Sequence, residues 1–86
     1  MAKYRVEISA TAARQLRRLP RDDQVRLLRA MVALGSEPRP AGCRKLQGYD
    51  DVFRIRVGTY RVIYSVEGRH LLVILLKVGH RKDVYR

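Results

Sequence analysis

Residues 52–64, with the sequence VFRIRVGTYRVIY, decide the fold of this 86-residue chain. Apolar and polar residues alternate on both sides of Gly58 and Thr59, and a period of two is typical of strands with one buried face. A two-residue loop that contains glycine is a strong signal for a tight β-hairpin. The stretch therefore predicts two antiparallel strands, residues 52–57 and 60–67.

The hairpin loop also predicts which side chains share a face of the sheet. Arg56 lies opposite Arg61, and Arg54 lies two residues along the same face. Two like charges directly opposite each other cost about 0.2–1 kcal/mol, so three arginines here indicate a site for an anion. The alternative is an exposed sheet face on which arginine stems cover apolar residues. The reverse face must pack on the core, and it carries Phe53, Ile55, Val57, Val62, Tyr64 and Val66.

A second turn and a nearly continuous apolar run complete a β-meander. Residues 67–69 mark the turn, and residues 70–78 are almost wholly apolar, as expected of a strand inside the sheet. Continued pairing across this turn is expected to place three apolar side chains on the arginine face: Leu72, Ile74 and Leu76.

The N-terminal third of the chain predicts a strand followed by a helix. Residues 3–8 alternate in polarity and suit an edge strand. Ser9 or Thr11 can cap a first helix that runs to about Leu19. Pro20 then breaks this helix.

A second helix follows, and it completes the predicted fold. Asp22 or Asp23 can cap it, and Gly35 is a natural end. Its wide apolar face is expected to be buried and consists of Val25, Leu28 and Val32, flanked by Leu27, Met31 and Leu34. We expect residues 1–86 to form a single α+β domain. In it, an N-terminal strand and a helical hairpin precede an antiparallel β-meander, and both helices pack on one face of the sheet.

The charge of the chain indicates its partners. Nineteen Lys and Arg against eight Asp and Glu give a formal net charge of +11, and most of the cations are arginine. Arginine makes flat, bidentate contacts with phosphate and carboxylate, so we expect a polyanion or an acidic protein as partner. A basic stripe on the first helix, together with two cations of the loop of residues 35–51, is expected to bind ribosomal RNA phosphates. It consists of Arg14, Arg17, Arg18, Arg21, Arg44 and Lys45. Its alternative is a solvated helix face.

Several classes of protein are excluded by composition. No apolar run approaches the ~20 residues of a membrane span, and the N-terminus does not resemble a secretory signal. One cysteine, Cys43, fits a protein of the reducing cytoplasm. With two histidines and no acidic cluster, we expect no metal site and no cofactor. Cys43 lies in the long loop of residues 35–51, which Leu46 is expected to pin to the core.

Three stretches and the order of the elements resemble the RelE/ParE superfamily of prokaryotic toxins. The stretches are residues 45–48 (KLQG), 53–64 (FRIRVGTYRVIY) and 78–85 (VGHRKDVY). The arginine and tyrosine of the last stretch favour the RelE-like branch. The resemblance implies a cytoplasmic, metal-independent endoribonuclease that cleaves messenger RNA in the ribosomal A site. It also implies an antitoxin that silences the toxin, and the charge of this chain suggests that this partner is acidic.

The resemblance further implies which residues form the active site: Arg54, Arg56, Arg61, Arg81 and Tyr85. Members of the branch often carry lysine at the first two of these positions. Arginine cannot be deprotonated in a protein, so neither Arg54 nor Arg56 can act as the general base here.

The tail residues leave two chemical roles open. Tyr85 can act as the base, if nearby guanidiniums lower its pKa, or it can stack on a nucleobase. His80 can supply a proton to the leaving group or can be an ordinary surface histidine. We expect His80 and Lys82 to contact RNA. The hydroxyls of Tyr60 and Tyr64 are expected to be structural. The rival functions are a ParE-like poison of DNA gyrase and a non-catalytic RNA-binding module.

Overall fold

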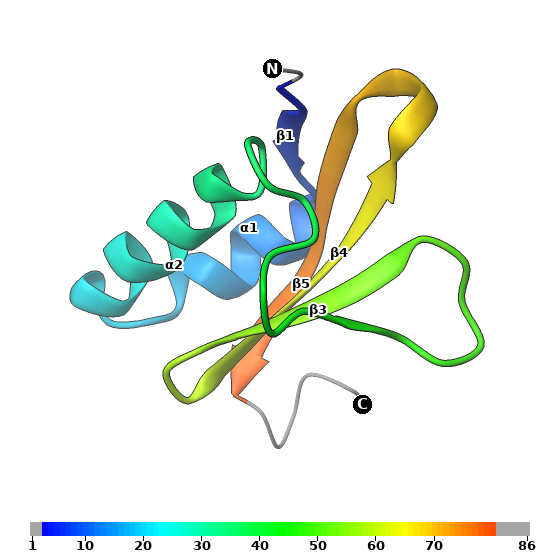
Figure 1. Ribbon diagram of the computed structural model, residues 1–86. Coiled ribbons are helices and arrows are strands. Elements are labelled where there is room, and N and C mark those ends of the chain that lie inside the picture. The colour runs from blue at the N-terminus through cyan, green and yellow to red at the C-terminus, as the bar shows by residue number, and fades with distance from the viewer. Residues whose placement is uncertain (1–2, 81–86) are drawn as a thin grey trace.

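The computed structural model describes residues 3–80. Figure 1 shows the α-helices packed against a twisted sheet. The elements in chain order are β1 (Arg5–Ile8), α1 (Ala10–Arg17), α2 (Arg21–Ala33), β2 (Arg44–Lys45), β3 (Val52–Val57), β4 (Tyr60–Glu67), the 3-10 turn η1 (Gly68–His70) and β5 (Leu72–His80). The expected site residues Arg81, Lys82 and Tyr85 lie outside the described residues.

The sheet has the order β1-β5-β4-β3-β2. Strands β3, β4 and β5 form the predicted antiparallel meander, and β5 lies inside the sheet between β1 and β4. The sheet as a whole is mixed, because β1, the predicted edge strand, pairs with β5 in parallel. After β1, the helical hairpin carries the chain to the opposite edge of the sheet, where β2 lies. The last strand, β5, then pairs with β1, so residues far apart in sequence are neighbours in the sheet.

The β3–β4 hairpin has the predicted register. Val57 pairs with Tyr60, and Arg56 pairs with Arg61. Gly58 opens the two-residue loop with a φ of 63°, a conformation that glycine adopts at little cost.

The helix boundaries differ from the prediction around Pro20. Ser9 caps α1, since its Oγ accepts a hydrogen bond from the Ala12 N–H at 3.1 Å. Helix α1 ends at Arg17 rather than Leu19, and Pro20 itself takes the N-cap position of α2. The expected capping role of Asp22 or Asp23 is therefore wrong: both lie in the first turn of α2. There the positive end of the helix dipole still favours a carboxylate.

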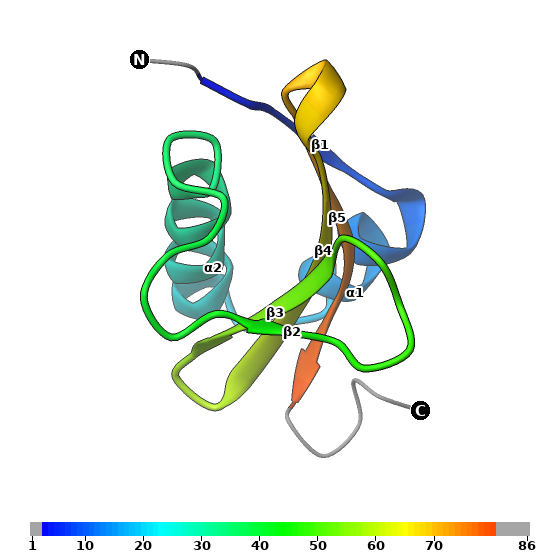
Figure 2. The same ribbon diagram turned by 45° about the vertical axis from the view of Figure 1, so that its right-hand side comes forward.

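Both helices contribute to one core on a single face of the sheet. The core consists of Ala12, Leu16, Leu27, Met31, Leu34, Phe53, Ile55, Tyr60, Val62, Tyr64, Val66, Val73, Leu75 and Val78. Figure 2 shows α2 along one side of the sheet.

Helix α2 buries only half of its predicted apolar face. Leu27, Met31 and Leu34 are buried, whereas Val25, Leu28 and Val32 are 41%, 38% and 69% exposed. A helix that packs on a sheet buries one stripe, and these three lie on another side of the helix.

Candidate phosphate-binding site on the sheet face

Cationic side chains from four strands share the sheet face that points away from the helices. Directly paired residues lie on the same face, and adjacent strands are about 4.8 Å apart. One cross-strand row therefore holds Arg56, Arg61 and Gly79. The next row holds Arg44, Arg54, Ile63 and Lys77. We call these two sets the arginine row and the mixed row.

A β-bulge between β4 and β5 determines which residues of β5 join these rows. Tyr64 pairs with Leu75, but Ile63 pairs with Lys77, so Leu76 is the extra residue. In an unbroken register Ile63 would face Leu76, and Lys77 would point into the core opposite Val62. A one-residue shift exchanges the two faces of a strand.

Of the expected floor of Leu72, Ile74 and Leu76, the register pairs the first two with β4 and leaves Leu76 as the extra residue of the bulge. Leu72 and Ile74 lie on the predicted face, opposite Glu67 and Ser65. Lys77 takes the place opposite Ile63 that the unbroken register gives to Leu76.

The bulge also separates His80 from the arginines. His80 pairs with Tyr60, whose side chain is in the core, and the two ring centroids are 5.1 Å apart. The imidazole therefore lies on the helix side of the sheet, while Arg61 lies on the other. Because of this placement, the structure does not bring His80 together with the cationic rows.

The two tyrosines of β4 have structural hydrogen bonds, as predicted. The Tyr60 hydroxyl donates to Asp23 Oδ2 at 2.8 Å, and this bond raises the pKa of Tyr60. The Tyr64 hydroxyl donates to the Pro38 carbonyl at 2.7 Å, and burial raises the pKa of Tyr64 well above its ordinary value. Both phenols stay protonated and take no part in the cationic rows.

The predicted basic stripe is not a feature of one helix. Arg14 and Arg17 lie in the last turn of α1, whereas Arg18 is its C-cap and Arg21 begins α2. All four side chains are exposed, so the group remains a basic surface around the helix junction.

The two loop cations expected with this stripe lie apart from it. Arg44 pairs with Arg54 in the mixed row, and Lys45 pairs with Phe53 at the outer edge of the sheet. Strand β2 holds both cations at the edge of the sheet, away from the helix junction. The loop sequence shows no alternation from which this strand could be predicted.

A pocket of about 630 Å³ adjoins the mixed row. Its lining consists of Ala41, Gly42, Cys43, Arg44, Arg54, Ile55 and Arg56. Cys43 is half-buried and packs against the core, so the loop is held there as well as at Leu46. The expected anchor at Leu46 is a backbone contact, since its N–H donates to the Val52 carbonyl at 2.8 Å. The pocket extends the cationic surface beyond the sheet edge.

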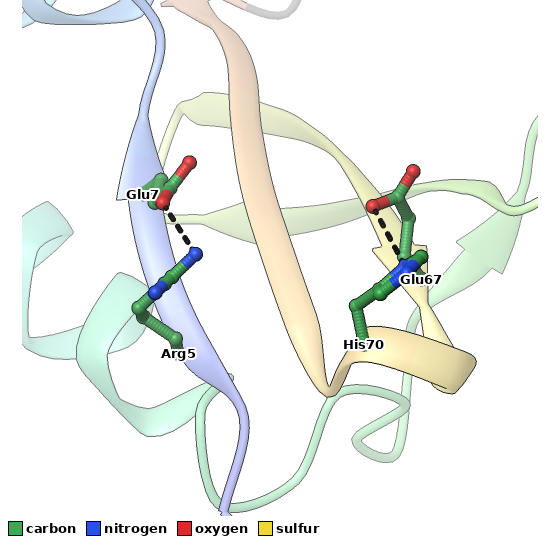
Figure 3. A network of polar contacts seen from close by, with 4 residues as sticks. All are labelled: Arg5, Glu7, Glu67 and His70. Carbon is green, nitrogen blue, oxygen red and sulfur yellow. Dashed lines mark ion pairs between the residues drawn. The ribbon is translucent and has the colours of Figure 1, made fainter.

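The opposite end of the same sheet face carries paired charges (Figure 3). Arg5 contacts Glu7 at 3.1 Å, and His70 lies 3.9 Å from Glu67. Glu7 and Glu67 are level with Ile74 and Leu72, several residues along β5 from Lys77. Negative charge on this face is thus placed away from the two cationic rows.

Two further properties concern the described part of the chain. Among residues 3–80, no three His, Cys, Asp or Glu side chains come together as a metal-ligand set. Neither helix in this range is long and apolar enough to span a bilayer.

Comparison with known proteins identifies clear relatives. The ParE toxin family of type II toxin–antitoxin systems (parDE) matches residues 6–85. Toxin RelG of Mycobacterium tuberculosis is 36% identical, over 96% of this chain and 97% of its own length.

Two solved structures share the fold over nearly the whole chain. The RelBE2 toxin–antitoxin complex of the same organism matches with a TM-score of 0.84 at 32% identity, covering 96% of this chain and 97% of the matched one. The archaeal RelE–RelB complex of Pyrococcus horikoshii matches with a TM-score of 0.82 at 35% identity, covering 98% and 100%.

Proposed function

We propose, because the chain belongs to the RelE/ParE superfamily of toxins of type II toxin–antitoxin systems, that it is a ribosome-dependent endoribonuclease. In this proposal it cleaves messenger RNA in the A site and so inhibits translation. The observation that carries the proposal is the convergence of the arginine row and the mixed row on one face of the sheet. Cationic side chains from four strands, guanidiniums on three of them and an ammonium on the fourth, suit a preorganised site for a phosphodiester.

Metal-independent RNA cleavage has three tasks: the 2′-hydroxyl must lose a proton, the charge of the phosphorane must be stabilised, and the 5′-oxygen must receive a proton as its bond to phosphorus breaks. The rows suit the second task. As the 2′-oxygen attacks phosphorus, negative charge accumulates on the phosphorane oxygens, and fixed cations stabilise it. Arg56 and Arg61 are directly opposite each other, and Arg54 lies in the adjacent row. In the proposed mechanism these three, with Arg81, hold the scissile phosphate.

The proton transfers require groups other than arginine, because a guanidinium does not deprotonate in a protein. We assign the base to Tyr85, which takes the proton of the 2′-hydroxyl. An ordinary tyrosine pKa is about 10, so activity near neutrality needs a decrease of ~3 units, and surrounding guanidiniums act in that direction. If Tyr85 instead stacks on a nucleobase, its replacement by phenylalanine will preserve most of the activity.

The small size of the protein supports a need for the ribosome. The cationic rows lie on an open sheet face, and a pocket of about 630 Å³ adjoins them. Orientation of the message must come from an external scaffold, and such orientation can contribute several kcal/mol to catalysis. In this proposal the arginines around the α1–α2 junction, which are exposed, contact ribosomal RNA phosphates.

An acidic antitoxin is the proposed protein partner. Both solved structures described above are complexes of a RelE-type toxin with its antitoxin, and this chain carries a net charge of +11. A partner rich in Asp and Glu that covers the cationic rows gains electrostatic attraction and blocks RNA. Coexpression with such a partner is expected to restore the growth of cells that the toxin alone arrests.

Gyrase poisoning is the second candidate, because the matching family carries the description of ParE. Two assays on one preparation separate the candidates: primer extension on translating ribosomes and supercoiling by DNA gyrase. The proposal predicts new message ends at the A site and unchanged supercoiling. Intact message together with inhibited supercoiling would establish the second candidate.

A further inference from the structure

The β-bulge of β5 has a consequence for substrate binding that goes beyond the arginines. We propose that Lys77, turned onto the cationic face by this bulge, contacts an RNA phosphate that sits over Gly79 and opposite Arg61. The identification of the phosphate as that of RNA rests on the proposed nuclease function. The phosphate site itself consists of Lys77, Gly79 and Arg61, which the register of β4 and β5 brings together on one face.

One position of the arginine row contributes no side chain of its own. Gly79 is the residue directly opposite Arg61, so the cations nearest to this position are Arg61 and its neighbours in the two rows. Lys77 is two residues away on the same strand and face, which makes it a diagonal neighbour of Arg61. Such neighbours are about 7–8 Å apart at Cα, within reach of two long cationic side chains that share one phosphate.

The backbone on both sides of Lys77 is hydrogen-bonded to side chains of α1 and of its N-cap residue. The Ser9 hydroxyl donates to the Leu76 carbonyl at 3.1 Å, and the Val78 N–H donates to Gln15 Oε1 at 2.8 Å. The extra residue of the bulge is thus held in place by side chains, and Lys77 projects from a rigid position. Bulges next to functional sites commonly re-aim a side chain in this manner.

The chemistry of Lys77 differs from that of the neighbouring arginines. Its ammonium is a compact point charge with three donors on a flexible stem, whereas each guanidinium presents a planar fork. The Lys77 side chain is exposed on this face. The flexible ammonium can therefore donate a hydrogen bond to a phosphate oxygen in several positions, while the planar guanidiniums fix the orientation of the phosphate.

The test uses inorganic phosphate as the probe, so that it does not depend on nuclease activity. The melting temperature of the full chain is measured against phosphate concentration at constant ionic strength, and the affinity follows from the shift. The variants are Lys77→Met, Lys77→Arg and the matched control Lys3→Met. Lys3 is also exposed but precedes β1, at the other end of the sheet.

The proposal predicts that Lys77→Met weakens phosphate binding about tenfold or more, on the scale of a lost contact to a charged group. Lys77→Arg retains most of the affinity, and Lys3→Met retains all of it. An unchanged affinity in Lys77→Met, or a parent protein that phosphate does not stabilise, would overturn the proposal. Message cleavage on ribosomes is measured with the same proteins. If the parent does not cleave message but Lys77→Met still has a lower phosphate affinity, the nuclease function is wrong and the phosphate site at Lys77 is supported.

Discussion

Replacement of Gly58 tests the hairpin that places Arg56 opposite Arg61. Gly58 has a φ of 63°, and a Cβ added there would meet Arg26 Nη1 at 2.7 Å. The Arg26 side chain is 60% exposed and can move away at little cost. The positive φ is therefore the main obstacle to a side chain. It costs an ordinary residue about 1–2 kcal/mol.

Alanine also reduces the conformational entropy of the unfolded chain, which offsets about 0.4–1 kcal/mol of this cost. Gly58→Ala is therefore expected to lower the free energy of unfolding by about 1 kcal/mol. For a domain of this size the melting temperature falls by about 4–8 °C. Gly58→Asn introduces the same Cβ contact but tolerates positive φ, so it is expected to melt close to the parent. Gly42→Ala is the control for strain alone, since Gly42 has a φ of 88° and no atom within 4 Å of an added Cβ.

Thermal unfolding followed by circular dichroism compares these variants with the parent. The order of melting temperatures is expected to be parent, then Gly58→Asn, then Gly58→Ala. If Gly58→Ala melts with the parent, the loop does not hold Gly58 at positive φ, and the register of the two arginines would need to be revised.

Three further outcomes are expected. Tyr64→Phe leaves the Pro38 carbonyl without its buried donor and lowers the free energy of unfolding by about 1–3 kcal/mol, measured by urea titration. The raised pKa values of Tyr60 and Tyr64 mean that the folded state holds these protons more tightly than the unfolded chain. The contribution of these two hydroxyls to the free energy of unfolding is therefore fully present below pH ~10 and decreases as the pH rises above it. The free energy of unfolding of Tyr64→Phe is expected to fall less between pH 9 and 11 than that of the parent. Arg61→Gln slows message cleavage on ribosomes by about 10²–10³, the effect of losing one donor to a developing negative charge; full activity in this variant would place the site elsewhere.

Local patterns were sufficient to predict the parts of the site that depend on one hairpin. The alternation around Gly58 determines the pairing of Arg56 with Arg61, and the structure confirms it. Ser9 is likewise a local signal, because an N-cap depends only on the residues that follow it.

The remaining features depend on contacts that a local pattern does not contain. Residues 71–76 are apolar throughout, so their sequence has no alternation from which the bulge or the face of Lys77 could be read. Helix α2 offers two apolar stripes, and only packing decides that Leu27 rather than Val25 is buried. The parallel pairing of β1 with β5 joins the two ends of the chain.

The most direct test of the proposed function compares RNA cleavage with and without ribosomes. Purified protein is incubated with one message in a translating system and, at the same concentration, with that message as free RNA. Primer extension locates the cuts, and end-group analysis identifies the product termini. The proposal predicts cuts between A-site nucleotides that leave a 2′,3′-cyclic phosphate, and little or no cleavage of free RNA. Intact message on the ribosome, or equal cleavage of the free RNA, would contradict it.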